Sequence, residues 1–78
     1  MDLSTAIIKR INYYLTKNNM TIWKLYKASG IPKSTLFALM SNPTTIPKLE
    51  TLQYICEGFG ITLREFFNDK IFDEIEND

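Results

Sequence analysis

The chain has 78 residues, of which 45% are apolar and 13% aromatic, so its composition is that of one small globular domain. Nine basic and nine acidic side chains give a formal net charge of zero. The single cysteine, Cys56, excludes an internal disulfide, and the lack of histidine excludes the usual zinc sites as well. We therefore expect no metal and no cofactor, and we expect the protein to work in a reducing cytoplasm.

The composition also disfavours an enzyme and a membrane protein. Acid–base and nucleophilic catalysis most often use histidine, which is absent, and the three glycines are too scattered for a phosphate-binding loop. No apolar run approaches the roughly 18 residues of a membrane span, and the first residues are not those of a signal peptide. A domain of this size leaves no room for a ligand-sensing unit. We expect a non-enzymatic binding module without a small-molecule ligand.

Charge is unevenly distributed along the chain. Residues 1–33 carry six basic side chains and one acidic side chain, a local charge of +5, whereas residues 34–78 have a local charge of −5. A DNA-binding protein needs a basic surface on one face rather than a basic average. On charge alone, a DNA-binding face and a solvated helix followed by an acidic tail remain equally good interpretations.

Three short helices with tight connections are predicted in the first half of the chain. Apolar residues recur at three- and four-residue spacing from about Ser4 to Asn18, which predicts the first helix. Thr21 is a suitable N-cap for a second helix, which ends at Gly30 because glycine readily adopts the left-handed conformation at helix ends. Pro32 suits the first turn of a third helix, whose inner face carries Leu36, Leu39 and Met40.

Two more helices are predicted in the second half. Residues 42–45 form a loop by composition. Pro47 is expected to open a fourth helix, whose apolar face consists of Leu49, Leu52, Ile55, Cys56 and Phe59. Thr62 and Glu65 have the spacing of a capping box, which predicts a short fifth helix over about residues 63–68. Because no segment alternates as a strand does, the predicted fold class is all-α.

The second and third predicted helices are the informative pair. Both are short, and the turn Ala28-Ser29-Gly30-Ile31 joins them. Ala28 permits close approach of the two helix axes, Gly30 allows the turn, and Ile31 fills the space beneath it. Such a turn sets two helices at a steep angle, so that one of them can lie in a DNA groove.

An ordered set of short stretches gives this chain a family resemblance. They are Met20-Thr21, Leu25, Lys27-Ala28-Ser29-Gly30-Ile31, Ser34-Thr35-Leu36, Leu39, Pro47, Thr51-Leu52, Ile55-Cys56, Gly58, Gly60-Ile61-Thr62-Leu63 and Glu65-Phe66-Phe67. With them, the chain resembles the Cro/lambda-repressor type of helix-turn-helix, also called the xenobiotic-response-element family. The resemblance implies a compact five-helix, lambda-repressor-like domain over residues 1–69, with the helix-turn-helix formed by the second and third helices.

The same resemblance implies a function. Proteins of this type bind double-stranded DNA sequence-specifically, generally as dimers, with the third helix in the major groove. We therefore expect a small bacterial or phage transcriptional regulator, acting as a repressor and as a homodimer. Residues 70–78 are expected to be an acidic tail or a helix extension that can contact the second subunit.

The chain departs from the family pattern at three positions. Ile22 stands where the family usually has a glutamine whose amide contacts a phosphate. Leu15 and Met40 stand where the family often has an Arg–Glu ion pair, and we expect the two apolar side chains to touch in the core instead. Ile22 and the neutral net charge favour an alternative function: an antitoxin-like or partner-binding module on the same fold, with weak or no DNA binding.

The outer face of the third helix is the predicted base-reading surface, through Lys33, Ser34, Phe37 and Ala38. Lysine can donate to guanine O6 and N7, serine can use either edge, and alanine or phenylalanine can pack on a thymine methyl group. Phosphate contacts are expected from the second helix, from the end of the third helix and from the following loop, through Thr21, Lys24, Lys27, Ser41, Asn42, Thr44 and Thr45.

The remaining apolar and aromatic residues near the ends of these helices have other interpretations. Dimer contacts are expected from the C-terminal part of the chain, which is too apolar for a free tail, through Phe67, Ile71, Phe72 and Ile75. Trp23, on the outer side of the second helix, can be a partner surface, a DNA-backbone contact or simply half-buried.

Overall fold

The computed structural model describes residues 1–42 and 44–76, and this part of the chain is helical and has no strand. Its elements are α1 (Leu3–Lys17), α2 (Ile22–Ser29), α3 (Lys33–Ser41), α4 (Leu49–Phe59), α5 (Leu63–Phe67) and the 3-10 helix η1 (Lys70–Asp73). The all-α fold class and the five predicted helices are confirmed. Pro43, in the predicted loop, and residues 77–78, in the predicted tail, lie outside the described residues.

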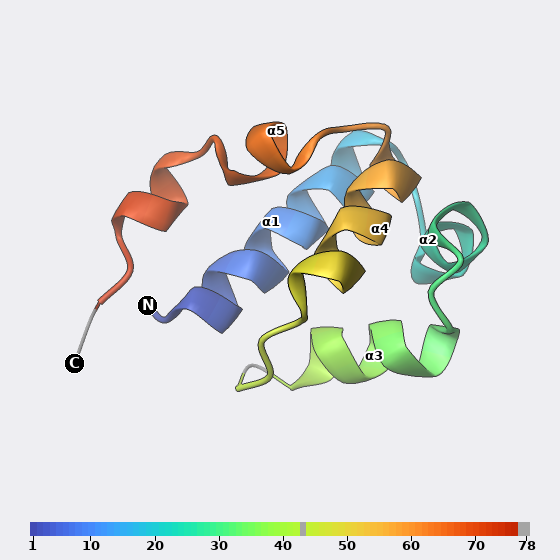
Figure 1. Ribbon diagram of the computed structural model, residues 1–78, viewed down its shortest axis with the longest axis horizontal. Helices are drawn as coiled ribbons and strands as arrows, with labels where there is room; N and C mark the ends of the chain where they lie inside the picture. The colour runs from blue at the N-terminus through green and yellow to red at the C-terminus, as the bar shows by residue number, and fades with distance from the viewer. Residues whose placement is uncertain (43, 77–78) are drawn as a thin grey trace.

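The helices are arranged so that α3 is well separated from the C-terminal segment. In Figure 1, α1 and α4 cross the middle of the molecule, α3 runs along the lower edge, and α5 lies at the upper edge. The helix α2 packs against both α3 and α4. The turn between α2 and α3 is therefore at one end of the molecule, and the segment after α5 is at the other.

Side-chain caps fix the starts of three of the α-helices. Asp2 accepts a hydrogen bond from the backbone at the start of α1, a cap that the sequence analysis did not assign. Thr21 accepts from the Lys24 backbone N–H at 3.2 Å, as predicted for the start of α2. Thr62 and Glu65 form the predicted capping box of α5. Each such cap supplies a partner to an N–H group that has none within its helix.

The helix α4 starts later than predicted. Lys48 occupies the N-cap position and Leu49 is the first helical residue, so the prediction that Pro47 opens this helix is wrong. Leu49 was also placed on the buried face, but 70% of its surface is exposed. Leu52, which is 1% exposed, is the first residue of α4 that packs in the core. The first turn of the helix extends beyond the core.

One core cluster draws on all five α-helices. Ile11, Leu25, Leu36, Ile55 and Phe66, one from each helix in chain order, are at most 1% exposed. Burying an apolar side chain of this size contributes roughly 1.5–3 kcal/mol to folding. Because α2 and α3 each insert a leucine into this cluster, the orientation of both helices is set by the core.

A glycine in α4 determines how closely α2 can pack. A Cβ atom added at Gly58 would lie 3.0 Å from Leu25 Cδ1 and 3.2 Å from Ser29 Cβ. Both distances are tighter than most contacts of real Cβ atoms, so a side chain here would require Leu25 or α2 to shift by a few tenths of an ångström. Gly58 thereby helps to place α2, and with it the turn that leads into α3.

Leu15 and Met40 both belong to the core region. Leu15 is 8% exposed, and Met40 is partly buried and packs against the same cluster. Their apolar character therefore suits their environment, because a lone charge at either position would lie against apolar side chains. Direct contact between the two residues stays a prediction.

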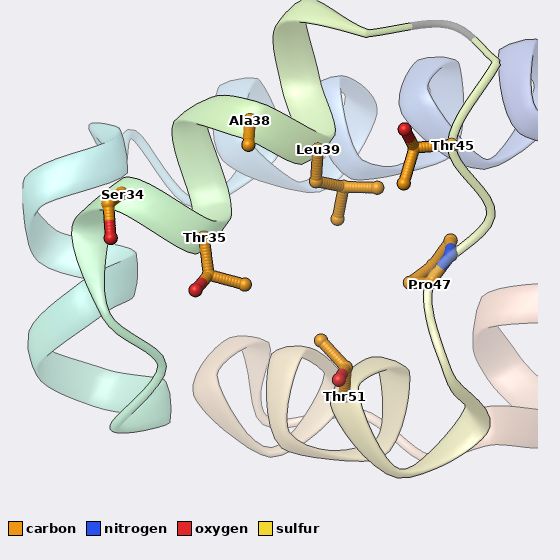
Figure 2. A pocket seen from close by; sticks show the side chains of 7 residues that line it. All are labelled: Ser34, Thr35, Ala38, Leu39, Thr45, Pro47 and Thr51. Atoms are coloured by element: carbon orange, nitrogen blue, oxygen red, sulfur yellow. The ribbon is translucent and has the colours of Figure 1, made fainter.

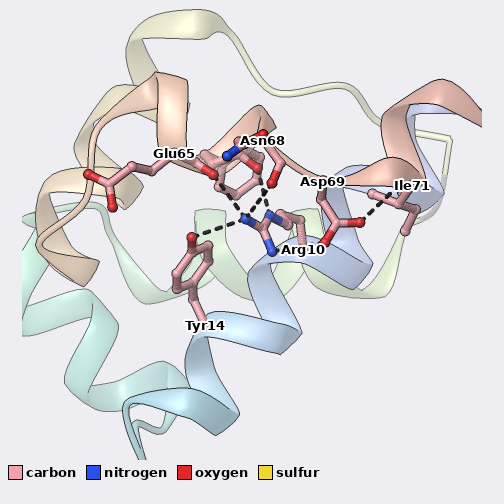
Figure 3. A network of polar contacts seen from close by, with 7 residues as sticks. Arg10, Tyr14, Glu65, Asn68, Asp69 and Ile71 are labelled. Carbon is pink, nitrogen blue, oxygen red and sulfur yellow. Dashed lines mark hydrogen bonds and ion pairs between the residues drawn. The ribbon is translucent and has the colours of Figure 1, made fainter.

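Arg10, which the sequence analysis counted with the basic half of the chain, is an internal residue. Only 7% of its surface is exposed. Its Nε donates to the Phe66 carbonyl oxygen at 2.7 Å and its Nη2 to the Glu65 carbonyl oxygen at 2.9 Å, while Nη1 lies 3.4 Å from Asp69 Oδ2 (Figure 3). The guanidinium group thus caps the C-terminal end of α5, and its charge is not available to a DNA phosphate.

Candidate nucleic-acid interface

The turn between α2 and α3 has the predicted glycine and the predicted buried isoleucine, whereas Ala28, which was expected at the close approach of the two helices, is exposed. Gly30 has a φ angle of 76°, in the left-handed region that glycine tolerates best. Ile31 is 6% exposed and belongs to the core cluster beneath the turn. Ser29 Oγ accepts a hydrogen bond from the Ile31 backbone N–H at 3.2 Å, which holds the chain between the two helices.

The helix α3 is divided into a buried face and an exposed face. Leu36 and Leu39 are 1% and 5% exposed and pack into the core. Ser34, Phe37 and Ala38 are exposed, and Phe37 is 54% exposed although it is a large apolar residue. Three of the four residues predicted to touch bases therefore share an open surface.

The fourth predicted base contact, Lys33, has a different environment. It is partly buried, and its Nζ lies 3.8 Å from the centre of the Trp23 ring system. The Nζ of Lys27 lies 5.5 Å from the centre of the same ring. Trp23 is 48% exposed, so one indole of α2 receives a lysine from its own helix and a lysine from α3.

Sequence reasoning missed this arrangement because no periodic signal carries it. Trp23 and Lys33 lie on different helices, on either side of the turn. Helical spacing predicts neighbours only within one helix. The angle between the two helix axes, which the turn sets, brings these side chains together. The sequence pattern does not contain that angle.

The predicted phosphate contacts of α2 lie at its exposed side. Thr21, Lys24 and Lys27 are all exposed. The Thr21 hydroxyl oxygen already accepts the Lys24 backbone N–H as the helix cap. The ammonium groups of Lys24 and Lys27, by contrast, are carried by long side chains that can reach a phosphate.

The predicted phosphate contacts after α3 are exposed but already bonded to neighbours. The Ser41 hydroxyl donates to the Phe37 carbonyl oxygen. Asn42 Oδ1 accepts from the backbone N–H of Thr44 at 3.2 Å and from its hydroxyl at 2.7 Å. These side chains shape the segment between α3 and α4, and their contact with phosphate stays a prediction, as it does for the exposed Thr45.

A pocket of about 330 Å³ lies between α3 and α4, beside the predicted base-reading surface. Its lining consists of Ser34, Thr35, Ala38, Leu39, Thr45, Pro47 and Thr51. Figure 2 shows Thr35 and Leu39 of α3 opposite Thr51 of α4. The pocket shares Ser34, Ala38 and Thr45 with the predicted DNA contacts.

The predicted dimer residues pack mainly within the chain itself. Phe67 and Phe72 lie against the core cluster, with their ring centres 4.9 Å apart. All four predicted residues, including Ile71 and Ile75, are partly buried. The 3-10 helix η1 covers part of the apolar surface that was assigned to a partner subunit, and dimerisation stays a prediction.

Three other kinds of feature would indicate a different function: a metal site, a membrane-spanning helix and a reactive thiol. Within residues 1–42 and 44–76, no group of three or more His, Cys, Asp or Glu side chains could hold a metal ion. No helix in the same part of the chain has the length and apolar character to cross a membrane. Cys56 is buried, and desolvation, helped by the charges of Glu57 and Glu65, raises its pKa to about 11. The thiol is therefore protonated and poorly nucleophilic at neutral pH.

Comparison with known proteins identifies the family. No curated protein and no solved structure matches the chain significantly. A family model described as the Cro/C1-type HTH DNA-binding domain matches residues 10–70, which extend from α1 to the first residue of η1 and contain the whole α2–turn–α3 unit. The resemblance found in the sequence is confirmed, and the chain belongs to the family of Cro/C1-type helix-turn-helix DNA-binding domains.

Proposed function

We propose that the protein is a small cytoplasmic transcriptional regulator, acting as a repressor, that reads double-stranded DNA with α3 in the major groove. The observation that supports this proposal is the two-sided nature of α3. Leu36 and Leu39 anchor the helix in the core, while Ser34, Phe37 and Ala38 are directed to solvent on the opposite side. A helix held in this way can present short polar and apolar groups to base edges.

The electrostatics of α2 and α3 are consistent with this role despite the neutral whole chain. Between Asp2 and Glu50 the sequence contains no acidic residue. Lys24, Lys27 and Lys33 therefore carry their charges on α2 and α3 without a carboxylate from the same helices. Each phosphate that they neutralise releases counterions, which makes binding weaken as salt rises.

In the proposed complex the protein is a homodimer. A two-fold dimer would present its two α3 helices to major grooves about 34 Å apart and read a near-palindromic site. The partly buried C-terminal residues Phe67, Ile71, Phe72 and Ile75 remain the proposed contact. Sedimentation of the free protein and of its DNA complex measures this directly, and a monomer in both states would refute the dimer.

The DNA-binding proposal is tested by selecting preferred sites from random DNA and titrating two lysine variants at several salt concentrations. Lys33→Ala should cost about 1–3 kcal/mol on the selected site and relax the preference at one base pair. Lys24→Ala should weaken the selected and scrambled sites equally and lower the salt slope by about one. Equal losses on both DNAs for Lys33→Ala would mean that this lysine contacts only the backbone.

A protein partner is the second candidate function. Ile46, between α3 and α4, and Leu49, the first residue of α4, are 58% and 70% exposed, which is unusual for two large aliphatic residues so close in sequence. They lie beside the pocket-lining residue Pro47. A wild-type protein that shows no salt-dependent binding to any selected DNA would favour this candidate over the proposed one.

A further inference from the structure

Trp23 and Lys33 form the contact that joins the exposed sides of α2 and α3. The Lys33 ammonium lies over the indole at 3.8 Å from the ring centre, which is well inside the distance of about 6 Å that defines a cation–π interaction. Tyr26, one turn along α2, has its ring centre 5.7 Å from that of Trp23 and supports the indole. The lysine is thus held by a ring that is itself packed against a neighbour.

The contact occupies only one side of the ammonium group. A lysine ammonium has three N–H donors, and an aromatic face can engage the side that is turned toward it. Among the described residues, the Lys33 ammonium group has no hydrogen-bond or ion-pair partner. Its donors that point away from the ring are therefore free to bind an acceptor on DNA.

We propose that Trp23 is a positioning residue that fixes the Lys33 side chain at the start of α3, ready to read a base. This inference rests on the proposed DNA-binding function and adds to it a residue of α2 that does not itself read the base. The physical advantage is entropic, because a free lysine loses several rotatable bonds when it is ordered on a ligand. A lysine that is already held over an indole loses fewer of them on binding.

Lys27 strengthens this interpretation. Its Nζ is 5.5 Å from the centre of the same ring, so two ammonium groups from two helices lie near one indole. The negative face of the ring reduces the cost of bringing like charges together. The outcome is a compact positive site at the junction of α2 and α3, where a polyanion can meet both charges at once.

The contact itself is tested by NMR on the protein without DNA. Protons above an indole are shielded, so the side-chain Hε signals of Lys33 should lie upfield of those of other lysines. Trp23→Leu should return them to the ordinary position, and Trp23→Phe should keep part of the shift. Ordinary Lys33 shifts in the wild type would overturn the inference at this first step. Trp23 is the sole tryptophan of the chain, so a Lys33→Met change should also alter the intrinsic fluorescence.

The positioning role is tested by a double-mutant cycle of DNA affinity. Trp23→Leu should weaken binding to the selected site by about two- to fivefold, with a smaller effect on scrambled DNA. In a Lys33→Met background the same change should have a clearly smaller effect, because only the more distant Lys27 remains near the ring. Trp23→Phe should restore part of the loss, since phenylalanine keeps an aromatic face.

Two controls separate positioning from general damage. Tyr54→Leu removes another exposed aromatic, 44% exposed on α4 and outside the predicted contacts, and should leave the affinity unchanged. Lys24→Met, on the same helix as Trp23, should lower the affinity by a factor that simply multiplies with that of Trp23→Leu. Far-UV circular dichroism of each variant establishes that the helices are intact.

The outcomes distinguish this inference from the proposed function. A wild type that binds no DNA refutes the proposed function, and the role of Trp23 falls with it. A wild type that binds DNA, with losses for Trp23→Leu and Lys33→Met that simply multiply, refutes the positioning role alone. Tighter binding by Trp23→Leu would also overturn it, because the indole would then withhold Lys33 rather than present it.

Discussion

Replacing Arg10 by methionine should destabilise the protein, because carbonyl groups at the end of α5 would lose their hydrogen-bond donor. Methionine preserves the aliphatic part of the side chain but removes the donors to the Phe66 and Glu65 carbonyl oxygens, at 2.7 and 2.9 Å. Phe66 is fully buried, so its carbonyl cannot easily turn to water. A third carbonyl, that of Asn68, lies at 3.5 Å from Nη2 and is the weakest of the set.

The magnitude follows from the number of groups that lose a partner. Leaving a buried acceptor unsatisfied costs about 1–3 kcal/mol. The Phe66 carbonyl is buried, whereas the Glu65 carbonyl is only partly buried and can bind water in part, so we expect a total loss of about 2–4 kcal/mol. The ion pair with Asp69 adds little, because that carboxylate is 44% exposed and its charge is screened by water. In a domain of this size the loss corresponds to a fall in Tm of at least about 10 °C.

Urea unfolding followed by circular dichroism measures this loss against two matched variants. Lys9→Met changes an exposed neighbour on α1 and should alter the stability by less than about 0.5 kcal/mol. Asp69→Asn removes the acidic partner but keeps every carbonyl contact, and should cost less than about 1 kcal/mol. If Asp69→Asn is as damaging as Arg10→Met, the ion pair and not the carbonyl capping holds the end of α5, and the reasoning above is refuted.

Two further predictions follow from the packing of α4. Gly58→Ala should destabilise the protein by about 1 kcal/mol, because the alanine Cβ would crowd Leu25 and Ser29 even though alanine is the better helix former. Urea unfolding measures this loss, and a more stable variant would contradict the close approach of α2. Since folding raises the pKa of Cys56 from its ordinary 9.0 to about 11, its contribution to stability should be complete below pH 9 and lost as pH rises through 11. As the pH rises from 9 to 11, the free energy of unfolding should therefore fall less steeply in Cys56→Ala than in the wild type.

The sequence predicted the elements and the inner face of α3 well because these depend on local signals. Caps such as Thr21 and the Thr62–Glu65 box, and the glycine at position 30, act within a few residues of their place in the chain. Helical periodicity identified Leu36 as a core residue for the same reason.

The sequence could not predict features that depend on contacts between distant segments. Arg10 stands three residues after Ile7 and four before Tyr14, on the apolar face of α1, and is in this way unlike the exposed Lys9. The carbonyl groups that bind its guanidinium, however, lie more than fifty positions away in the chain. The exposure of Leu49 depends on where the core ends, and the Trp23–Lys33 contact depends on the angle between two helices. Periodicity within one helix contains none of this information.

The contrast between Arg10 and Lys33 shows how one kind of contact can serve stability in one place and recognition in another. Both cations lie over aromatic rings, Arg10 at 4.7 Å from the centre of the Tyr14 ring and Lys33 at 3.8 Å from that of Trp23. The guanidinium also donates to carbonyls and to the Tyr14 hydroxyl, so its hydrogen-bonding capacity is used inside the protein. The lysine keeps donors that face away from a half-exposed ring. A cation whose donors are satisfied stabilises the fold, whereas a cation that is oriented but unsatisfied is suited to bind a partner. That difference agrees with a structural role for Arg10 at the end of α5 and with the proposed DNA contact of Lys33 at the start of α3.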